Sequence, residues 1–161
     1  MINEALSQLN NKLSGIEWVV FGGVAVAIYK GELYRDFDDI DIIIEDKEDQ
    51  IKNNLKDYSL EIKLRNGRKR GYLTVNETKV ELLFLVNDKE LDLADGKFKF
   101  QSIKKIKFNN LEIPVVDLQS LYCAKLRHKE SLEKEAQKME KKLKNCNNDI
   151  EIIQNILKNS K

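Results

Sequence analysis

The sequence predicts a mixed α+β fold, in which helices flank a mixed central sheet and a helical extension follows at the C-terminus. Short apolar runs of strand length, such as residues 16–21 and 80–85, alternate with segments of helical spacing. From residue 117 onward the apolar positions follow helical spacing alone. At 161 residues the chain fits a single domain that is large enough to bury a core.

The first part of the chain combines a helical pattern with two apolar strands. Ile2, Leu6 and Leu9 recur at helical spacing, which predicts an amphipathic helix over residues 2–13. The elements expected next are a buried strand at 16–21, a short apolar helix at 24–29 that Gly31 ends, a strand at 39–45, a polar helix at 47–58 and a strand at 59–64.

Turn signals divide the middle of the chain into further strands. Asn66-Gly67 favours a tight hairpin turn, and Asn109-Asn110 predicts a second turn. The strands expected around these turns are residues 72–75, 80–85, 98–100, 103–108 and 111–116. Pro114 has no N–H to donate to a neighbouring strand, so it predicts that its strand lies at an edge of the sheet.

The C-terminal segment is expected to be helical. Asp117 can cap the start of a long helix, whose densely charged part at residues 129–144 is expected to face solvent. A last helix is expected at about residues 149–157. The predicted organisation is a core of residues 1–116, with C-terminal helices over 117–161 that pack on the same domain or extend from it.

The overall composition excludes some classes of function. Lys and Arg number 28 against 27 Asp and Glu, so the net charge of +1 gives no general signature of binding to nucleic acid. The longest apolar runs have strand length, which predicts no membrane-spanning helix. Two cysteines and the lack of a signal peptide pattern predict a reducing, cytoplasmic location.

The most informative stretch of the sequence lies between residues 18 and 45. An apolar strand runs into Gly22-Gly23, and a second strand opens with Asp39 and Asp41. Glycines before a helix allow backbone amides to approach an anion such as a phosphate. Two carboxylates on one face of a strand repel each other unless a cation lies between them. This combination predicts a phosphate-binding turn beside a divalent metal site.

A third acid is expected to complete this metal site. Glu81 stands within an otherwise apolar strand, and it can face the two aspartates if its strand lies beside theirs. A buried acid without a partner costs several kcal/mol, so a metal or a base is expected near it. Sites built from carboxylates suit Mg²⁺ better than Zn²⁺. The ordinary alternative is that Glu81 pairs with Lys63 or Lys79 across the sheet.

These motifs together resemble those of the nucleotidyltransferase superfamily, whose fold is related to that of DNA polymerase β. The resemblance covers roughly residues 16–128. Within the superfamily, the spacing is most similar to that of small lincosamide- and aminoglycoside-modifying enzymes, and to nucleotidyltransferase-like proteins of abortive-infection and toxin–antitoxin systems. It is carried by the following residues: Gly22, Gly23, Arg35, Asp39, Asp41, Glu81, and Lys125 in the helix after the strand at 111–116.

The resemblance implies an activity and a role for each of these residues. It implies transfer of a nucleoside monophosphate from an NTP, with ATP the expected donor, to a hydroxyl acceptor with release of pyrophosphate. Two Mg²⁺ ions would be held by Asp39 and Asp41, and Glu81 would complete the set or act as base for the acceptor hydroxyl. The triphosphate would be held by the glycine pair, Gly22 and Gly23. Phosphate contacts, or order in the acidic site, would come from Arg35 and Lys125.

The sequence also departs from the family pattern. Phe37 stands two residues before Asp39, where many relatives have a small hydroxyl residue or a histidine, and the third acid is a glutamate. The second domain of larger members is absent from this sequence. The acceptor is therefore open, and an alternative is a non-catalytic antitoxin or regulatory module with a protein partner. A nucleic-acid acceptor is disfavoured by the near-neutral charge.

Some further residues have an ordinary and a functional reading. Arg65, Arg68, Lys69 and Arg70 around the turn at 66–67 are expected to be solvated, and the alternative is contact with a phosphate or a nucleic-acid acceptor. His128 is expected on the surface rather than as a ligand. The apolar side chains of the charged helix could dock on a partner: Leu132, Met139 and Leu143.

Overall fold

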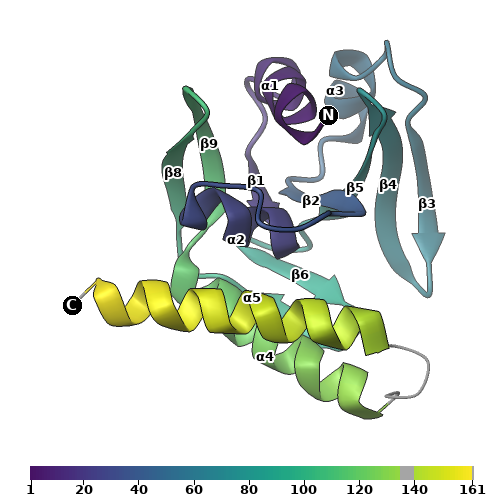
Figure 1. The fold of residues 1–161 in the computed structure, drawn as a ribbon. Helices are drawn as coiled ribbons and strands as arrows, with labels where there is room; N and C mark the ends of the chain where they lie inside the picture. Colours follow the sequence, from purple (N-terminus) through teal and green to yellow (C-terminus); the bar gives the residue numbers. More distant parts are fainter. Residues whose placement is uncertain (135–139, 161) are drawn as a thin grey trace.

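The computed structural model describes residues 1–134 and 140–160 (Figure 1). Its helices are α1 (Ile2–Lys12), α2 (Gly22–Lys30), α3 (Glu48–Asn54), α4 (Leu118–Lys134) and α5 (Glu140–Asn159). Its strands are β1 (Trp18–Phe21), β2 (Asp39–Ile44), β3 (Glu61–Arg65), β4 (Arg68–Val75), β5 (Thr78–Phe84), β6 (Glu90–Leu93), β7 (Gly96–Lys99), β8 (Ile103–Phe108) and β9 (Leu111–Val116).

The main sheet has seven strands in the order β3-β4-β5-β2-β1-β9-β8. The pairs β2–β5 and β1–β9 are parallel and the other neighbours are antiparallel, so the sheet is mixed. In Figure 1, α1 and α3 lie at one end of the molecule and α4 and α5 at the other, with α2 between them and packed against α5. This architecture confirms the predicted fold class.

Along strand β2, acidic residues alternate with buried isoleucines, so the carboxylates and the core isoleucines lie on opposite faces. Ile40, Ile42 and Ile44 are buried in the core, whereas Asp39 and Asp41 point to the opposite face. The burial of the three isoleucines fixes the register of the strand, because a slip by one residue would place the carboxylates in the core.

The turn between β1 and α2 is tighter than the sequence predicts. The helix was expected from residue 24, but α2 begins at Gly22 directly after β1. It ends as predicted at Gly31, which adopts a left-handed conformation with φ 91°. The glycine pair is therefore the first turn of the helix rather than a loop before it.

The C-terminal helices are more buried than the sequence predicts. Leu132, Cys146 and Ile150 form a small apolar cluster between α4 and α5, so the charged segment is not simply a solvated helix. Helix α5 begins at Glu140, before the expected start at residue 149, and it packs against α2. Leu143 packs against the same cluster, and Met139 lies outside the described residues.

Two further expectations about strands are corrected. Pro114 was expected in an edge strand, but β9 lies between β1 and β8. The ladder between β9 and β1 contains the single pair Val20–Val115, so the missing N–H of Pro114 removes little of the pairing. The sequence analysis also missed β6, which forms a separate two-stranded sheet with β7. No helix among the described residues is long and apolar enough to cross a membrane.

Candidate active site

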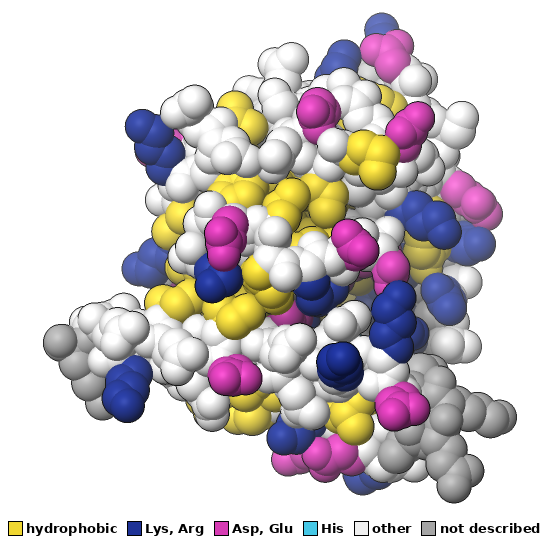
Figure 2. All heavy atoms as spheres, in the orientation of Figure 1, with side chains coloured by type: hydrophobic (Ala, Val, Ile, Leu, Met, Phe, Trp, Pro, Cys, Tyr) yellow, Lys and Arg dark blue, Asp and Glu magenta, His cyan; other side chains and the backbone are white. Residues whose placement is uncertain are grey.

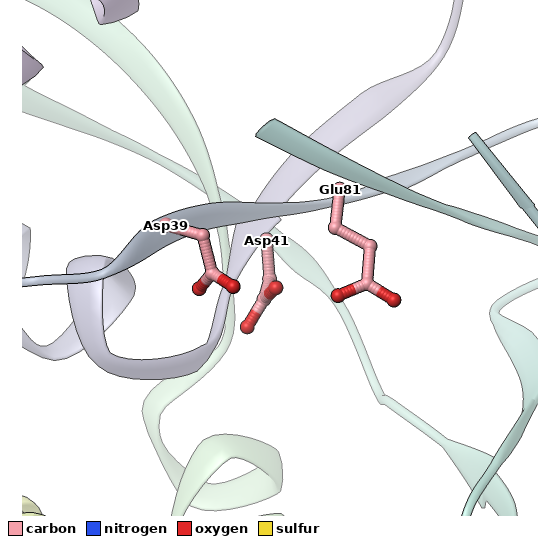
Figure 3. Close-up of side chains that lie close together, drawn as sticks. All are labelled: Asp39, Asp41 and Glu81. Carbon is pink, nitrogen blue, oxygen red and sulfur yellow. The ribbon is translucent and has the colours of Figure 1, made fainter. Parts of the chain in front are cut away.

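Three carboxylates meet where strands β2 and β5 run side by side. The parallel register places Asp41 directly opposite Glu81, as expected for a third acid on the neighbouring strand. Asp39, Asp41 and Glu81 each offer an oxygen atom, and these atoms lie within 4.8 Å of one another. Figure 3 shows the three side chains projecting to the same side of the two strands. This spacing allows one cation to contact all three residues.

The electrostatics of this acidic triad, Asp39, Asp41 and Glu81, are unfavourable for three negative charges. Burial raises the pKa of Asp41 to about 8, and the neighbouring charges of Asp39 and Glu81 contribute to the rise. Burial also raises the pKa of Asp39 and the pKa of Glu81 above their ordinary values. A divalent cation would offset this repulsion, so the residues fit the Mg²⁺ site that the sequence predicts.

The first turn of α2 lies directly against the triad. Phe21, the last residue of β1, is opposite Asp41 in the sheet, and Gly22 follows it with a φ of +69°. A Cβ atom at Gly22 would lie 2.5 Å from Oδ2 of Asp41. Both the left-handed backbone and the contact with Asp41 therefore require glycine at this position. No side chain among the described residues caps α2, so its first amides are free to donate to an anion.

Gly23 has a different environment from Gly22. A Cβ atom at Gly23 would lie 2.4 Å from Nη2 of Arg35 and 3.1 Å from the ring of Phe37. The guanidinium carbon of Arg35 lies 4.1 Å from the centroid of that ring. The structure therefore places Arg35 behind the glycine turn, with Phe37 stacked on it, and not on the wall of the cavity described below.

A fourth carboxylate, Asp149 of α5, joins Arg35 to Lys125. Asp149 has no exposed surface, and its oxygen atoms lie 3.1 Å from Nη2 of Arg35 and 2.8 Å from Nζ of Lys125. Tyr34 also donates a hydrogen bond to Asp149. Burial alone would raise the pKa of Asp149, but the two cations and the hydroxyl outweigh it and hold this pKa below its ordinary value. The C-terminal helix thus anchors both predicted phosphate-contacting bases.

A cavity of about 460 Å³ opens beside the triad, within the size range of small-ligand sites. Its wall combines the α2 turn, two members of the triad (Asp41 and Glu81), the β3–β4 hairpin and helix α4. The polar residues among those that line it are Asp41, Arg65, Asn66, Arg68, Arg70, Glu81, Asp95, Lys125 and His128. Leu83, Leu93, Leu121 and Ala124 supply an apolar part of the wall.

The structure brings most of the predicted site residues together. Asp39, Asp41 and Glu81 converge, Gly22 and Lys125 reach the cavity, and Gly23 and Arg35 stand behind it. Roles for these residues in metal or nucleotide binding stay predictions. His128 is exposed as expected, but it also lines the cavity.

Asp149 is not among the predicted site residues, although the sequence contains a signal for it. Cys146, Asp149, Ile150 and Ile153 share the buried stripe of α5 at helical spacing. An acid within such an apolar stripe indicates a buried ion pair, because an uncompensated buried carboxylate is costly.

The family model of the aminoglycoside-2''-adenylyltransferases matches residues 2–141 of this sequence. The chain belongs to this family. The match confirms the predicted resemblance to nucleotidyltransferases, and it places the chain in a class of transferase enzymes. A comparison with curated protein sequences found no match.

Solved structures of the same fold support the architecture. A candidate nucleotidyltransferase from Thermotoga maritima has a TM-score of 0.62 and 21% identity, over 89% of this chain and 92% of that chain. The lincosamide antibiotic adenylyltransferase LnuA, bound to lincomycin, has a TM-score of 0.53 and 20% identity over 73% of this chain and 83% of that one. ANT(2'')-Ia, in complex with adenylyl-2''-tobramycin, has a TM-score of 0.60 and 8% identity over 99% and 97%. At these identities the likeness shows the fold.

Proposed function

We propose that this protein is a Mg²⁺-dependent nucleotidyltransferase that moves a nucleoside monophosphate from an NTP to a hydroxyl group of a small molecule, with release of pyrophosphate. ATP is the proposed donor, since the family is named for adenylyl transfer. The observation that carries the proposal is the acidic triad, whose three carboxylates converge within 4.8 Å and two of whose members, Asp41 and Glu81, line a ligand-sized cavity.

The proposed roles follow from the position of each residue. Asp39 and Asp41 hold the metal ions, and Glu81 completes the ligand set from the neighbouring strand. When bound, the Mg²⁺ ions neutralise the negative charge of the phosphates. The free amides at the start of α2 and the ammonium group of Lys125 would bind the triphosphate beside Asp41.

The transfer itself needs one proton acceptor from the protein. The acceptor hydroxyl oxygen bonds to the α-phosphorus of the donor while the bond from that phosphorus to the leaving pyrophosphate breaks. As the alternative to completing the ligand set, Glu81 acts as the base, and the hydroxyl proton passes to its carboxylate oxygen. The raised pKa of Glu81 makes it a stronger base than an ordinary carboxylate. Positioning and charge neutralisation supply most of the rate in such transfers.

Calorimetry on the full-length chain tests this proposal. ATP, GTP, CTP and UTP are titrated with Mg²⁺ or with EDTA, into wild type and into the double variant Asp39→Asn/Asp41→Asn. We expect metal-dependent binding, tightest for ATP, that the double variant loses. Binding that persists in the double variant would contradict the assigned metal site. No binding of any nucleotide by wild type would favour the alternative of a non-catalytic module.

A further inference from the structure

The β3–β4 hairpin carries basic side chains into the cavity from the side opposite to α2. Arg65, Arg68 and Arg70 all line the cavity near Glu81. Figure 2 shows basic side chains gathered on the right of this face, over β3 and β4. Their positive charges lower the pKa of Glu81, against the larger effect of burial. The hairpin is thus a local concentration of positive charge in a chain whose net charge is only +1.

The register of the hairpin makes this concentration unfavourable on its own. Arg65 of β3 lies directly opposite Arg68 of β4, and Arg70 follows on the same face of the sheet. Like charges that face each other across two strands destabilise the pair. An anion bound between the guanidinium groups would offset this cost, as a cation would do at the acidic triad.

Lys69 and Arg70 lie close to carboxylates, whereas Arg65 and Arg68 do not. Lys69 lies 2.8 Å from Asp46 and 2.7 Å from Glu48, so its charge is neutralised on the other face. Arg70 lies 3.9 Å from Glu81, and it also donates to the backbone oxygen of Asp92. Within residues 1–134 and 140–160, neither Arg65 nor Arg68 has a carboxylate within 4.0 Å. The hydroxyl of Tyr72, a neutral group, lies beside Arg65, and Arg65 is exposed. Neither arginine is therefore neutralised by a carboxylate in direct contact, and both guanidinium groups can reach a ligand in the cavity.

The strand order decides which ligand these arginines face. In the strand order β3-β4-β5-β2-β1, the acidic triad lies on the neighbouring strands β5 and β2. The α2 turn follows β1 on one side, and the hairpin β3–β4 lies on the other. Phosphoryl transfer needs the leaving group and the attacking hydroxyl on opposite sides of the phosphorus. If the α2 turn binds the leaving phosphates, the hairpin side holds the acceptor.

We infer that the acceptor is a small hydroxyl compound that carries an anionic group, such as a phosphate, sulfate or carboxylate, bound by Arg65 and Arg68. This inference rests on the proposed function. Arg guanidinium groups bind such oxyanions through paired hydrogen bonds. A polyamine sugar such as an aminoglycoside would instead bring its positive charges against these arginines. The cavity of about 460 Å³ suits a small molecule rather than a nucleic acid.

Arginine side-chain NMR tests the inference with sulfate as the probe. The ¹⁵N-labelled full-length chain is saturated with Mg²⁺ and the non-hydrolysable donor α,β-methylene-ATP, and sulfate is titrated against chloride at equal ionic strength. The Nε–H signals are assigned with Arg65→Lys and Arg68→Lys. We expect both signals to shift saturably with sulfate, equally with and without the nucleotide. Absence of a sulfate-specific shift would overturn the inference.

The donor must be distinguished from the acceptor in the same experiment. If the nucleotide alone shifts both arginine signals and then blocks sulfate, the arginines bind the donor and the inference is wrong. If the nucleotide does not bind at all, the proposed function fails, while the sulfate titration still reports on the arginine site.

A double variant and its control complete the test. Arg65→Gln/Arg68→Gln is expected to weaken sulfate binding at least tenfold and to change the dissociation constant of α,β-methylene-ATP less than twofold. The control Lys104→Gln/Lys107→Gln removes two exposed charges from β8, remote from the cavity wall, and is expected to change neither constant. An equal loss of nucleotide and sulfate binding in the arginine variant would count against the inference.

Discussion

Two clusters of polar side chains in this protein place carboxylates in opposite electrostatic environments. At the acidic triad, Asp39, Asp41 and Glu81 face one another, and burial raises the pKa of Asp41 to about 8. At the other cluster, Asp149 is more deeply buried, yet its pKa lies below the ordinary value because Arg35, Lys125 and Tyr34 surround it. The basic residues near the triad, such as Arg70 at 3.9 Å from Glu81, offset its negative charge only in part. The charge of Asp149, in contrast, is compensated by Arg35 and Lys125 in direct contact.

This difference distinguishes a site that can bind a ligand from a buried ion-pair network that stabilises the fold. A carboxylate whose cations come from the protein stabilises the fold and has no capacity left for a ligand. A group of carboxylates with little compensation reduces stability until a ligand supplies the charge. The two clusters meet at Lys125, which pairs with Asp149 and lines the cavity beside Asp41. Substitutions in the two clusters should therefore have opposite consequences.

The largest effect is expected from Asp41→Asn. Loss of this carboxylate should lower the rate of nucleotidyl transfer roughly 1,000-fold, because charge neutralisation supplies most of the catalysis. The same change removes charge repulsion, so the midpoint of thermal unfolding in EDTA should not fall. Activity is measured as pyrophosphate release, and unfolding by circular dichroism. Asp38→Asn, at an exposed acid next to the triad, is the control and should stay within twofold of wild-type activity. A large loss of stability in Asp41→Asn would contradict the comparison.

Asp149→Asn is expected to act mainly on stability. It leaves Arg35 and Lys125 without their buried partner, which should cost about 3 kcal/mol of unfolding free energy. Urea unfolding measures this cost. The matched control is Asp57→Asn, which breaks the exposed pair with Lys12 and should cost less than about 1 kcal/mol. Equal losses of unfolding free energy in the two variants would mean that the buried ion pairs of Asp149 stabilise the fold no more than an exposed pair does.

The third comparison uses two glycines with similar backbones and different neighbours. Gly22 and Gly31 both have positive φ, but a Cβ atom would meet Asp41 at Gly22 and nothing within 4 Å at Gly31. Gly31→Ala should therefore cost about 1 kcal/mol of stability from backbone strain alone, with activity kept. Gly22→Ala should cost more and should also reduce Mg²⁺-dependent ATP binding, since it displaces the carboxylate of Asp41. Unchanged ATP binding in Gly22→Ala would separate the glycine turn from the metal site.

The sequence predicted the acidic triad because its determinants are local. The alternation of acids and isoleucines in residues 39–42 fixes the face on which Asp39 and Asp41 lie. Glu81 stood out as an acid in an apolar strand, and only the pairing of β2 with β5 had to be assumed. The glycine pair itself also indicated a turn after β1, although the sequence did not predict that α2 begins at Gly22. These features need a few neighbouring residues and one strand contact.

The ion pairs of Asp149 and the position of Arg65 and Arg68 at the cavity depend on long-range packing. Sequence patterns therefore indicated them poorly. Asp149 meets Arg35 across 114 positions of the chain, and no local pattern encodes that contact. Arg65 and Arg68 were expected to be solvated, with phosphate contact as the alternative. Arg65 is exposed as expected, and the place of both residues beside the cavity follows from the order of the strands. The prediction that the strand of Pro114 lies at an edge was wrong for the same reason, because the position of a strand in a sheet depends on all the other strands.

The smallest expected effect is an opposite dependence of the two clusters on pH. The folded protein keeps a proton on Asp41 up to about pH 8, whereas the unfolded chain releases it near the ordinary pKa of 3.8. Between these values the folded state binds more protons, so the triad makes stability in EDTA fall as pH rises. Asp149 behaves in the opposite sense, because its lowered pKa gives stability above pH 4 that is lost in acid.

Urea unfolding of wild type, Asp41→Asn and Asp149→Asn at pH 5.5, 6.5, 7.5 and 8.5 in EDTA would measure this difference. Relative to wild type, Asp41→Asn should show a flatter decline, and Asp149→Asn should be less stable by a constant amount. The lowered pKa of His128 makes a contribution of opposite sign in this range, which cancels between wild type and Asp41→Asn. It does not cancel fully in Asp149→Asn, because the charge of Asp149 raises the pKa of His128. Added Mg²⁺ should reduce the decline in wild type and Asp149→Asn but not in Asp41→Asn, because the ion binds the ionised carboxylates. An identical dependence of unfolding free energy on pH in all three proteins would mean that the carboxylates of the triad do not repel one another. Charge repulsion would then no longer be an argument for a bound cation.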